Sequence, residues 1–475
     1  MKKQIPVIGL EMHCELKSNS KVFSPAKNSY SEIPNSNIAP LDMAFPGTLP
    51  VVNRKCVEDA LKVSMVLNCR QPEFIYFDRK NYYYPDLPKG YQITQMADPV
   101  GVAGEIKIEV EGKLISVSIH DVHLEEDSAS LDHFFDTTNI DYNRSGVPLL
   151  ELVTEPCFHS AEEAVAFLEH MIRVYRYLDV SDADTKRGQI RCDVNVSIMD
   201  QDSDVLGTKV EVKNVNSISG VRDTILYEIE RQTKLKEEGR YAEVEQETRR
   251  WDEDTGTTKR MRSKVDAIDY KYFVEPNIPK YKVTKEWLEQ IKKGIPRLHM
   301  ERKQDYIHHY GLSSYDAEIL VKDKEISDYF EECLQLGVDP KSAANWIISQ
   351  ILGVINKDNI SIRDLYFTPK RLKDLTHELE KGTISSKQAK EIFLKVIEEK
   401  KEAKDFISKD STQISDKEEL TKIIDEILAN NQAQIEEYKN GRTNIFDYFV
   451  GQVMKNTRGK ANPVLTKEIL TEKLQ

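Results

Sequence analysis

The chain has 475 residues, of which 39% are hydrophobic and 31% are charged. This length allows two or three domains with a sizeable core, and the composition is that of a globular protein, which excludes disordered and fibrous classes. No hydrophobic run is long enough for a transmembrane helix, and the N-terminus lacks the cleavage site of a signal peptide. We therefore expect a cytoplasmic protein with no membrane partner.

The net charge of −13 at first argues against a nucleic-acid partner. Most of this charge belongs to residues 1–292, however, and the nearly neutral remainder can still present a basic face. The six cysteines are widely and irregularly spaced, without a CxxC pair. This spacing predicts free thiols in a reducing compartment and argues against a zinc ion bound by cysteines.

The first part of the chain contains many short β-like runs, at 107–127, 190–200 and 208–218, in which β-branched residues alternate with polar ones. Two helical patterns interrupt them, at 160–180 and 220–239, and Ser160 is the expected N-cap of the first. Residues 1–292 are therefore predicted to form an α+β domain with a mixed sheet.

A segment with three prolines, from Glu275 to Leu298, marks the next boundary. The chain after it shows a helical period almost throughout, and a polar break near residue 410 separates two groups of helices. We predict two all-α domains, at 293–405 and 406–475.

The first strand places Glu11, His13 and Glu15 on one face, since strand residues alternate between two faces. Such a polar face usually points to solvent. Other acidic stretches nonetheless suggest a site, at His123 to Asp127, at Glu151 and at Asp193 with Asn195.

Glu151 lies inside the apolar run VPLLELVTEP, where an ionised carboxylate is costly unless it is paired or bound to a metal. One interpretation is an ion pair with a residue such as Arg144. The other is a Mg²⁺ or Mn²⁺ site, because oxygen-rich ligands with one imidazole suit these ions better than zinc. The chain has no Walker A sequence and no kinase-type Gly-rich loop, so an ATP site here would not be of a common kind.

Two basic stretches each allow two interpretations, a surface loop or a phosphate-binding site. The segment DRKNYYYPDLPKGYQITQ, residues 78–95, combines cations with tyrosines that suit stacked bases. Near the C-terminus, Lys455, Arg458 and Lys460 form a short basic loop, which is a credible phosphate contact.

Taken together, these stretches resemble one family, the B subunit of the bacterial-type tRNA-dependent amidotransferase. The matching pieces run in order along the chain and include IGLEMHCEL, FPGTLPVVN, DRKNYYYPDLPKGYQITQ, HLEEDSA, DYNRSGVPLLELVTEP, GQIRCDVNVS, GTKVEVKNVNS and VGQVMKNTRGKANP. The resemblance implies a cradle domain (1–292) with a kinase-like active site, a helical domain (293–405) and a tail domain (406–475) that contacts tRNA.

The resemblance also implies a reaction and its partners. ATP would phosphorylate the side-chain carboxylate of Glu-tRNA(Gln) or Asp-tRNA(Asn), and ammonia from a glutaminase A subunit would replace the phosphate. A small C subunit would complete a heterotrimer. The alternative is a scaffold subunit that binds tRNA without catalysing a step. Many relatives carry a zinc site after SKxF and before PGxLPV, but these regions hold no cysteine here, so no structural zinc is expected.

Site residues follow from the matching motifs. The implied Mg²⁺ ligands are Glu11, His13, Glu125, Glu126 and Glu151, and of these Glu11, His13, Glu126 and Glu151 are the expected catalytic residues. The expected contacts to ATP are Arg79, Lys80, Lys213 and Asn214. The expected contacts to tRNA are Tyr82, Tyr84, Lys89, Lys455, Arg458 and Lys460.

Overall fold

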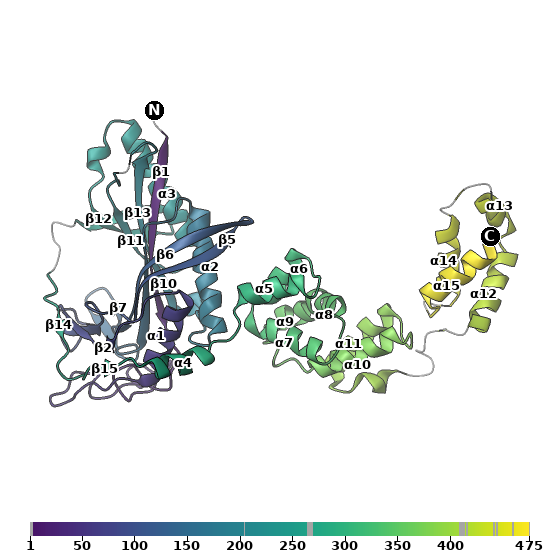
Figure 1. Cartoon of the computed structure of the whole chain (residues 1–475), viewed down its shortest axis with the longest axis horizontal. Coiled ribbons are helices and arrows are strands. Elements are labelled where there is room, and N and C mark those ends of the chain that lie inside the picture. The colour runs from purple at the N-terminus through teal and green to yellow at the C-terminus, as the bar shows by residue number, and fades with distance from the viewer. Residues whose placement is uncertain are drawn as a thin grey trace. The chain divides into compact units, whose positions relative to one another are not determined.

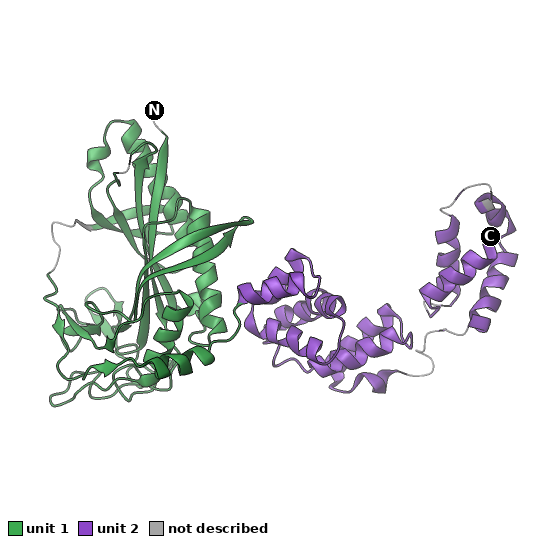
Figure 2. Cartoon of the chain, viewed as in Figure 1, with its two compact units in different colours: residues 1–298 green, residues 299–475 purple. Residues whose placement is uncertain are grey.

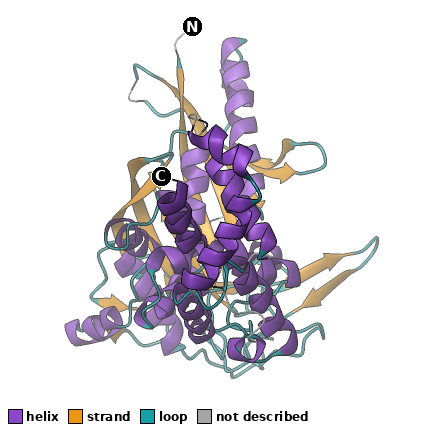
Figure 3. Ribbon diagram, turned by 90° about the vertical axis from the view of Figure 1, so that its right-hand side faces the viewer, coloured by secondary structure: helices purple, strands orange, loops and turns teal. Residues whose placement is uncertain are grey.

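The computed structural model describes residues 3–203, 205–263, 269–407, 414, 417–439, 442, 445–457 and 460–474. The chain divides into two compact units, Met1–Leu298 and His299–Gln475 (Figure 2). All named strands belong to the first unit, and the described part of the second unit consists of helices and their connections (Figures 1 and 3). The predicted α+β class is confirmed.

The first unit is built on a mixed eight-stranded sheet with the order β13-β12-β11-β10-β1-β9-β6-β5. Neighbouring strands are antiparallel except β11 and β12, which are parallel. Parallel neighbours need a crossover, and α3 (Ile218–Glu237) with η2 (Tyr241–Glu243) provides it. The strand bounds are β1 (Gln4–Glu15), β5 (Gly101–Val110), β6 (Lys113–Glu126), β9 (Pro148–Thr154), β10 (Ile190–Asp200), β11 (Val210–Val215), β12 (Glu247–Asp252) and β13 (Thr257–Ser263).

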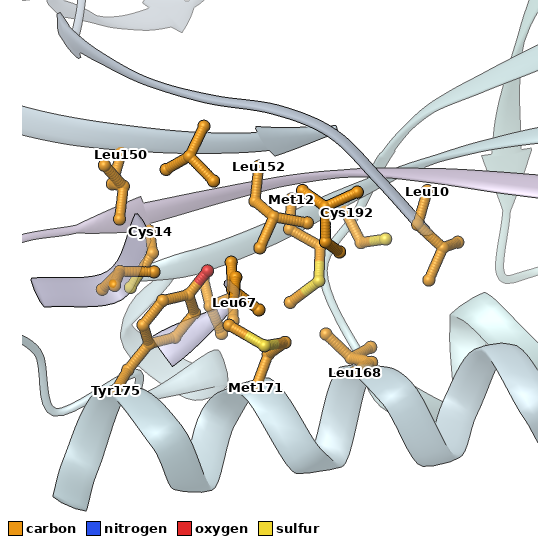
Figure 4. Packing of buried hydrophobic residues seen from close by; sticks show 14 of the residues in the cluster. Leu10, Met12, Cys14, Leu67, Leu150, Leu152, Leu168, Met171, Tyr175 and Cys192 are labelled. Carbon is orange, nitrogen blue, oxygen red and sulfur yellow. The ribbon is translucent and has the colours of Figure 1, made fainter. Parts of the chain in front are cut away.

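One face of this sheet is apolar and is covered by α2 (Ala161–Tyr177), which connects β9 to β10. Leu168, Met171 and Tyr175 recur at helical spacing and point towards the strands, where Met12, Cys14, Leu150 and Leu152 meet them (Figure 4). The side chain of Ser160 accepts a hydrogen bond from the backbone N–H of Glu163, so the predicted N-cap is confirmed. Packing of α2 thus fixes which face of β1 is left for polar residues.

Smaller elements flank the large sheet. They are the helices α1 (Arg54–Val66), η1 (Thr185–Arg187) and α4 (Lys285–Lys293), the sheet β14-β3-β4 (Phe273–Val274, Asp78–Asn81, Tyr91–Thr94), the pair β15-β2 (Tyr281–Lys282, Phe74–Ile75) and the hairpin β7-β8 (Ser130–His133, Thr138–Asp141). All six cysteines are free thiols, as their spacing predicted.

The second unit holds two separate clusters of buried hydrophobic residues, one within 306–403 and one within 420–474. The division into domains 293–405 and 406–475 stays a prediction. Within the described residues, every helix is too short or too polar to cross a membrane. The helices are α5 (His299–His308), α6 (Ser314–Val321), α7 (Lys324–Gln335), α8 (Pro340–Trp346), η4 (Ile347–Ile351), α9 (Leu352–Asp358), α10 (Pro369–Glu380), α11 (Ser386–Glu399), η5 (Ala403–Phe406), α12 (Lys417–Ala429), α13 (Gln432–Lys439), α14 (Ile445–Asn456) and α15 (Pro463–Leu474).

Candidate active site on the polar face of the sheet

The face of the sheet opposite α2 carries the polar residues of β1, and the strand register decides which side chains meet there. In β1, His13 lies opposite Glu151 of β9, and Glu151 in turn lies opposite His123 of β6. On the other side of β1, Glu11 lies opposite Asp193 of β10. Directly opposed residues of antiparallel strands have neighbouring side chains, so segments far apart in the sequence converge here.

The first cluster is centred on the Glu151 carboxylate. Its Oε2 atom lies 3.3 Å from His13 Nε2 and 3.0 Å from His123 Nε2. His123 Nδ1 lies 2.7 Å from Asp121 Oδ1, which fixes the orientation of its ring. Glu125 completes the group, since one ligand atom each of His13, Glu125 and Glu151 lies within 4.8 Å of the others.

The electrostatics of this cluster are those of a desolvated anion between two cations. Burial alone would lower the pKa of His13, but the attraction of Glu151 and Glu125 outweighs it and raises that pKa to about 9. The same balance raises the pKa of His123. Conversely, His123 and His13 lower the pKa of Glu151 despite its burial. Burial and the charge of Glu151 raise the pKa of Glu125.

This donor set fits a divalent cation. Two carboxylates suit Mg²⁺ and Mn²⁺, and an imidazole favours Mn²⁺ more than Mg²⁺. A cation bound here would compete with a proton on His13, whose pKa is raised, because a metal-binding imidazole must be deprotonated. His123 was not among the predicted ligands, although it stands two residues before Glu125 in the same alternating run and therefore shares its face.

The second cluster lies beside the first on the same face. One oxygen each of Glu11, Asp193 and Glu211 lies within 4.8 Å of the others. Lys213 Nζ lies 2.8 Å from both Asp193 Oδ2 and Glu211 Oε1, and Asn195 Nδ2 donates a 2.9 Å hydrogen bond to Glu11 Oε1. The structure thus separates Glu11 from the His13 cluster and joins it to Lys213.

Glu126 takes part in neither cluster. Both of its oxygens lie 2.6 Å from Lys89 Nζ, and Oε1 also accepts the backbone N–H of Ile93 at 2.9 Å. Because β6 alternates its side chains between two faces, Glu125 and not Glu126 joins His13 and Glu151. Lys89, expected to contact tRNA, is therefore held by Glu126.

The two predicted phosphate contacts next to each other in β3 differ in their surroundings. Burial would lower the pKa of Lys80, but the charges of Glu125, Tyr272 and Glu151 outweigh it and raise that pKa. The Lys80 ammonium lies over the ring of Tyr270, 5.0 Å from its centroid. Arg79 is held by Glu275, with Nε–Oε2 and Nη2–Oε1 distances of 2.5 and 3.0 Å. Lys80 is thus the better placed of the two.

The remaining predicted residues are dispersed. The pairing of Glu151 with Arg144 is wrong: the Arg144 guanidinium donates to the carbonyl oxygens of Ser128 and Ala129 at 2.9 Å. Tyr82 packs against Tyr270, with ring centroids 5.8 Å apart, and Tyr84 is exposed.

At the C-terminal end, Lys455 is exposed and Lys460 is partly buried. Arg458 and the side chain of Asn214 lie outside the described residues.

Comparisons with known proteins show the family to which this chain belongs. Residues 6–289 match the family described as the GatB/GatE catalytic domain, and residues 328–474 match the GatB domain. Relatives named as the B subunit of aspartyl/glutamyl-tRNA(Asn/Gln) amidotransferase include those of Persephonella marina and Geotalea daltonii, 44% and 43% identical over 99% of both chains. The relative of Enterococcus faecalis is 42% identical over 98% of both chains.

The sheet with its two polar clusters is therefore the catalytic domain of an amidotransferase component. The chain belongs to the family of the aspartyl/glutamyl-tRNA(Asn/Gln) amidotransferase B subunit, and the resemblance seen in its motifs is confirmed.

Proposed function

We propose that this chain catalyses an ATP-dependent phosphorylation of the side-chain carboxylate of Glu-tRNA(Gln) or Asp-tRNA(Asn). A carboxylate oxygen attacks the γ-phosphorus and ADP leaves. Ammonia then attacks the acyl carbon of the acyl phosphate, and phosphate leaves to give the amide. The observation that carries this proposal is the cluster of His13, Glu125 and Glu151 within the catalytic-domain match.

The difficulty of this reaction is that two anions must approach each other. His13, Glu125 and Glu151 would hold Mg²⁺, or Mn²⁺ in its place, and such an ion offsets the repulsion between the substrate carboxylate and the phosphates of ATP. Lys80, whose pKa is raised by the charges of Glu125 and Glu151, would bind a phosphate oxygen as negative charge moves during transfer. Asp121 and His123 would keep the Glu151 carboxylate in place.

The second cluster has a complementary role. Lys213 pairs with Asp193 and Glu211, and it can exchange these partners for phosphate oxygens of the nucleotide without moving far. Glu11, whose carboxylate accepts a hydrogen bond from Asn195, belongs to this second cluster and would help to hold the cations that neutralise the phosphates. Both clusters lie on one rigid sheet, which suits a site that must hold two substrates in register.

The names of the relatives supply the wider setting. They are subunits of an enzyme that acts on tRNA(Asn) and tRNA(Gln). We propose that the present chain likewise forms a heterotrimer with an A subunit and a C subunit. The A subunit is a glutaminase, which supplies ammonia. The reaction belongs to protein synthesis and would take place in the cytoplasm, where aminoacyl-tRNA is made.

The proposal is tested with the chain assembled with its partner subunits. His13→Ala and Glu151→Ala should each lower tRNA-dependent ATP hydrolysis by a factor of roughly 10² or more, because each removes a metal-holding group. Glutaminase activity, which belongs to another component of the complex, should remain.

The matched control is His133→Ala, which removes an exposed histidine of β7. Full transamidation by His13→Ala or Glu151→Ala would instead favour the scaffold alternative, in which the chain only binds tRNA.

A further inference from the structure

The first unit contains a cavity of about 1120 Å³ that no step of the proposed reaction uses. It lies where the end of β1 meets the segment after α2, the loop at residues 28–31 and the β7–β8 hairpin. Sites for small ligands typically have volumes of about 300–1,000 Å³, so this cavity has room for more than a small substrate. Its lining is mostly polar side chains, including Ser18, Asn28 and Gln189.

The cavity adjoins the candidate active site. Glu15 and Arg191 both line it, and both belong to the polar face of the sheet, Arg191 lying directly opposite His13. Glu15 follows His13 by two residues, which is about 6.7 Å along a strand. A glutamyl group esterified to a ribose spans about 6 Å by its bond lengths. A nucleoside in the cavity could therefore present its attached amino acid to His13, Glu125 and Glu151.

Two exposed cations at the cavity suit phosphate. Within the described residues Lys186 makes no ion pair, and Arg187 has only a 3.6 Å approach to Asp184. Two acids of the lining, Asp179 and Asp182, are paired at 3.0 and 2.8 Å with Lys17, which also lines the cavity.

An aromatic ring lines the same cavity. Tyr30 is 85% exposed, so its ring is free to stack on a ligand. Exposed aromatic rings beside cations are the usual means of binding single-stranded nucleic acid, since the ring stacks on a base and the cations hold phosphates.

We propose that this cavity binds the unpaired 3′ end of the RNA substrate, with a base stacked on Tyr30 and the adjoining phosphates at Lys186 and Arg187. This inference rests on the proposed function, because it takes the attached amino acid to react at the His13 cluster. It assigns to these three residues the placement of the substrate, separate from the chemistry of phosphorylation.

The test compares two RNA probes bound to the assembled enzyme without ATP or metal ion: a full-length tRNA and the same tRNA lacking its 3′-terminal adenosine. The wild type should bind the full-length tRNA about five- to tenfold more tightly, the size expected for one stacked base. Tyr30→Ala and Lys186→Gln should shrink this ratio towards one, and Tyr30→Phe should preserve it because the ring is retained.

The matched controls are Tyr315→Ala, an exposed tyrosine of α6, and Lys113→Gln, an exposed lysine at the β5–β6 turn; both should keep the wild-type ratio. The proposal is overturned if the wild type does not distinguish the two tRNAs, if Tyr30→Ala and Lys186→Gln keep the full ratio, or if they weaken both tRNAs equally. Because the assay uses no ATP, failure of the proposed phosphorylation appears separately, as retained activity of His13→Ala.

Discussion

At the scale of single residues, Glu151 shows how burial and function combine. It stands between Leu150 and Leu152 in β9, but its side chain lies on the opposite face, where two imidazoles within 3.3 Å stabilise the carboxylate. Removing one partner from such a group leaves a charge without compensation, which is costly in a protein interior. The residues behind the cluster should therefore matter nearly as much as the cluster itself.

The substitution Asp121→Asn tests the importance of these supporting residues, because Asp121 contacts the cluster only through His123. Asp121 accepts from His123 Nδ1 and so keeps His123 Nε2 aimed at Glu151. We expect its replacement to weaken Mn²⁺ binding about 10- to 100-fold, as replacements of such outer partners typically do. Titration of Mn²⁺ followed by electron paramagnetic resonance, without ATP, measures this directly. Asp132→Asn, an exposed aspartate of β7, is the control, and equal affinities in both variants would contradict the assignment.

At the scale of elements, β1 divides stability and activity between its two faces. Met12 is fully buried against α2, whereas Glu11 lies on the polar face among other acids. Burial raises the pKa of Glu11, so its ionised form at neutral pH costs stability in the folded chain. In a strand with one core face and one reactive face, a substitution on the core face should lower stability, whereas a substitution at the next residue should lower activity without lowering stability.

Two variants measure this division. Met12→Ala should destabilise the chain by about 2–5 kcal/mol, because it leaves a cavity in a packed core. Glu11→Gln should leave the urea unfolding midpoint at pH 7.5 unchanged or raised, since it removes the cost of the ionised carboxylate, and should still lower ATP-dependent amidation. Met12→Leu is the control of similar volume. A large loss of stability in Glu11→Gln would contradict this account.

At the scale of the whole molecule, the second compact unit holds two separate buried clusters, and we propose that the C-terminal one contributes to tRNA binding. The buried cluster within 306–403 does not include residues of the last helices, so removing residues 408–475 should leave it intact. Lys455 and Lys460 lie in the removed part.

Truncation after Ile407 should therefore weaken tRNA binding much more than ATP binding, and the loss should shrink as salt concentration rises, because phosphate contacts are salt-dependent. Filter binding of tRNA at two salt concentrations, with ATP binding measured in parallel, makes the comparison. The double variant Lys455→Gln, Lys460→Gln separates the loss of these charges from the loss of the helices. Equal tRNA affinity of the truncated and full-length chains would remove the role assigned to this region.

The sequence by itself determined the nature of the elements and the family. Alternation along β1 identified its polar face, the helical period identified α2 with its cap at Ser160, and the long motifs identified the relatives. These features are local, since each depends on residues close together in the chain, and local patterns are what periodicity and capping report.

Only the tertiary structure decided which side chains meet. The sequence named both Glu125 and Glu126 as metal ligands, left Arg144 open as an ion-pair partner of Glu151 and grouped Glu11 with His13. It did not place His123 or Glu211 among the site residues. Alternation gives the face of a residue but not its neighbours, which depend on the strand order β11-β10-β1-β9-β6 and on the register between strands. That order is set by packing α2 and α3 across one face of the sheet, a long-range choice that no short stretch of sequence contains.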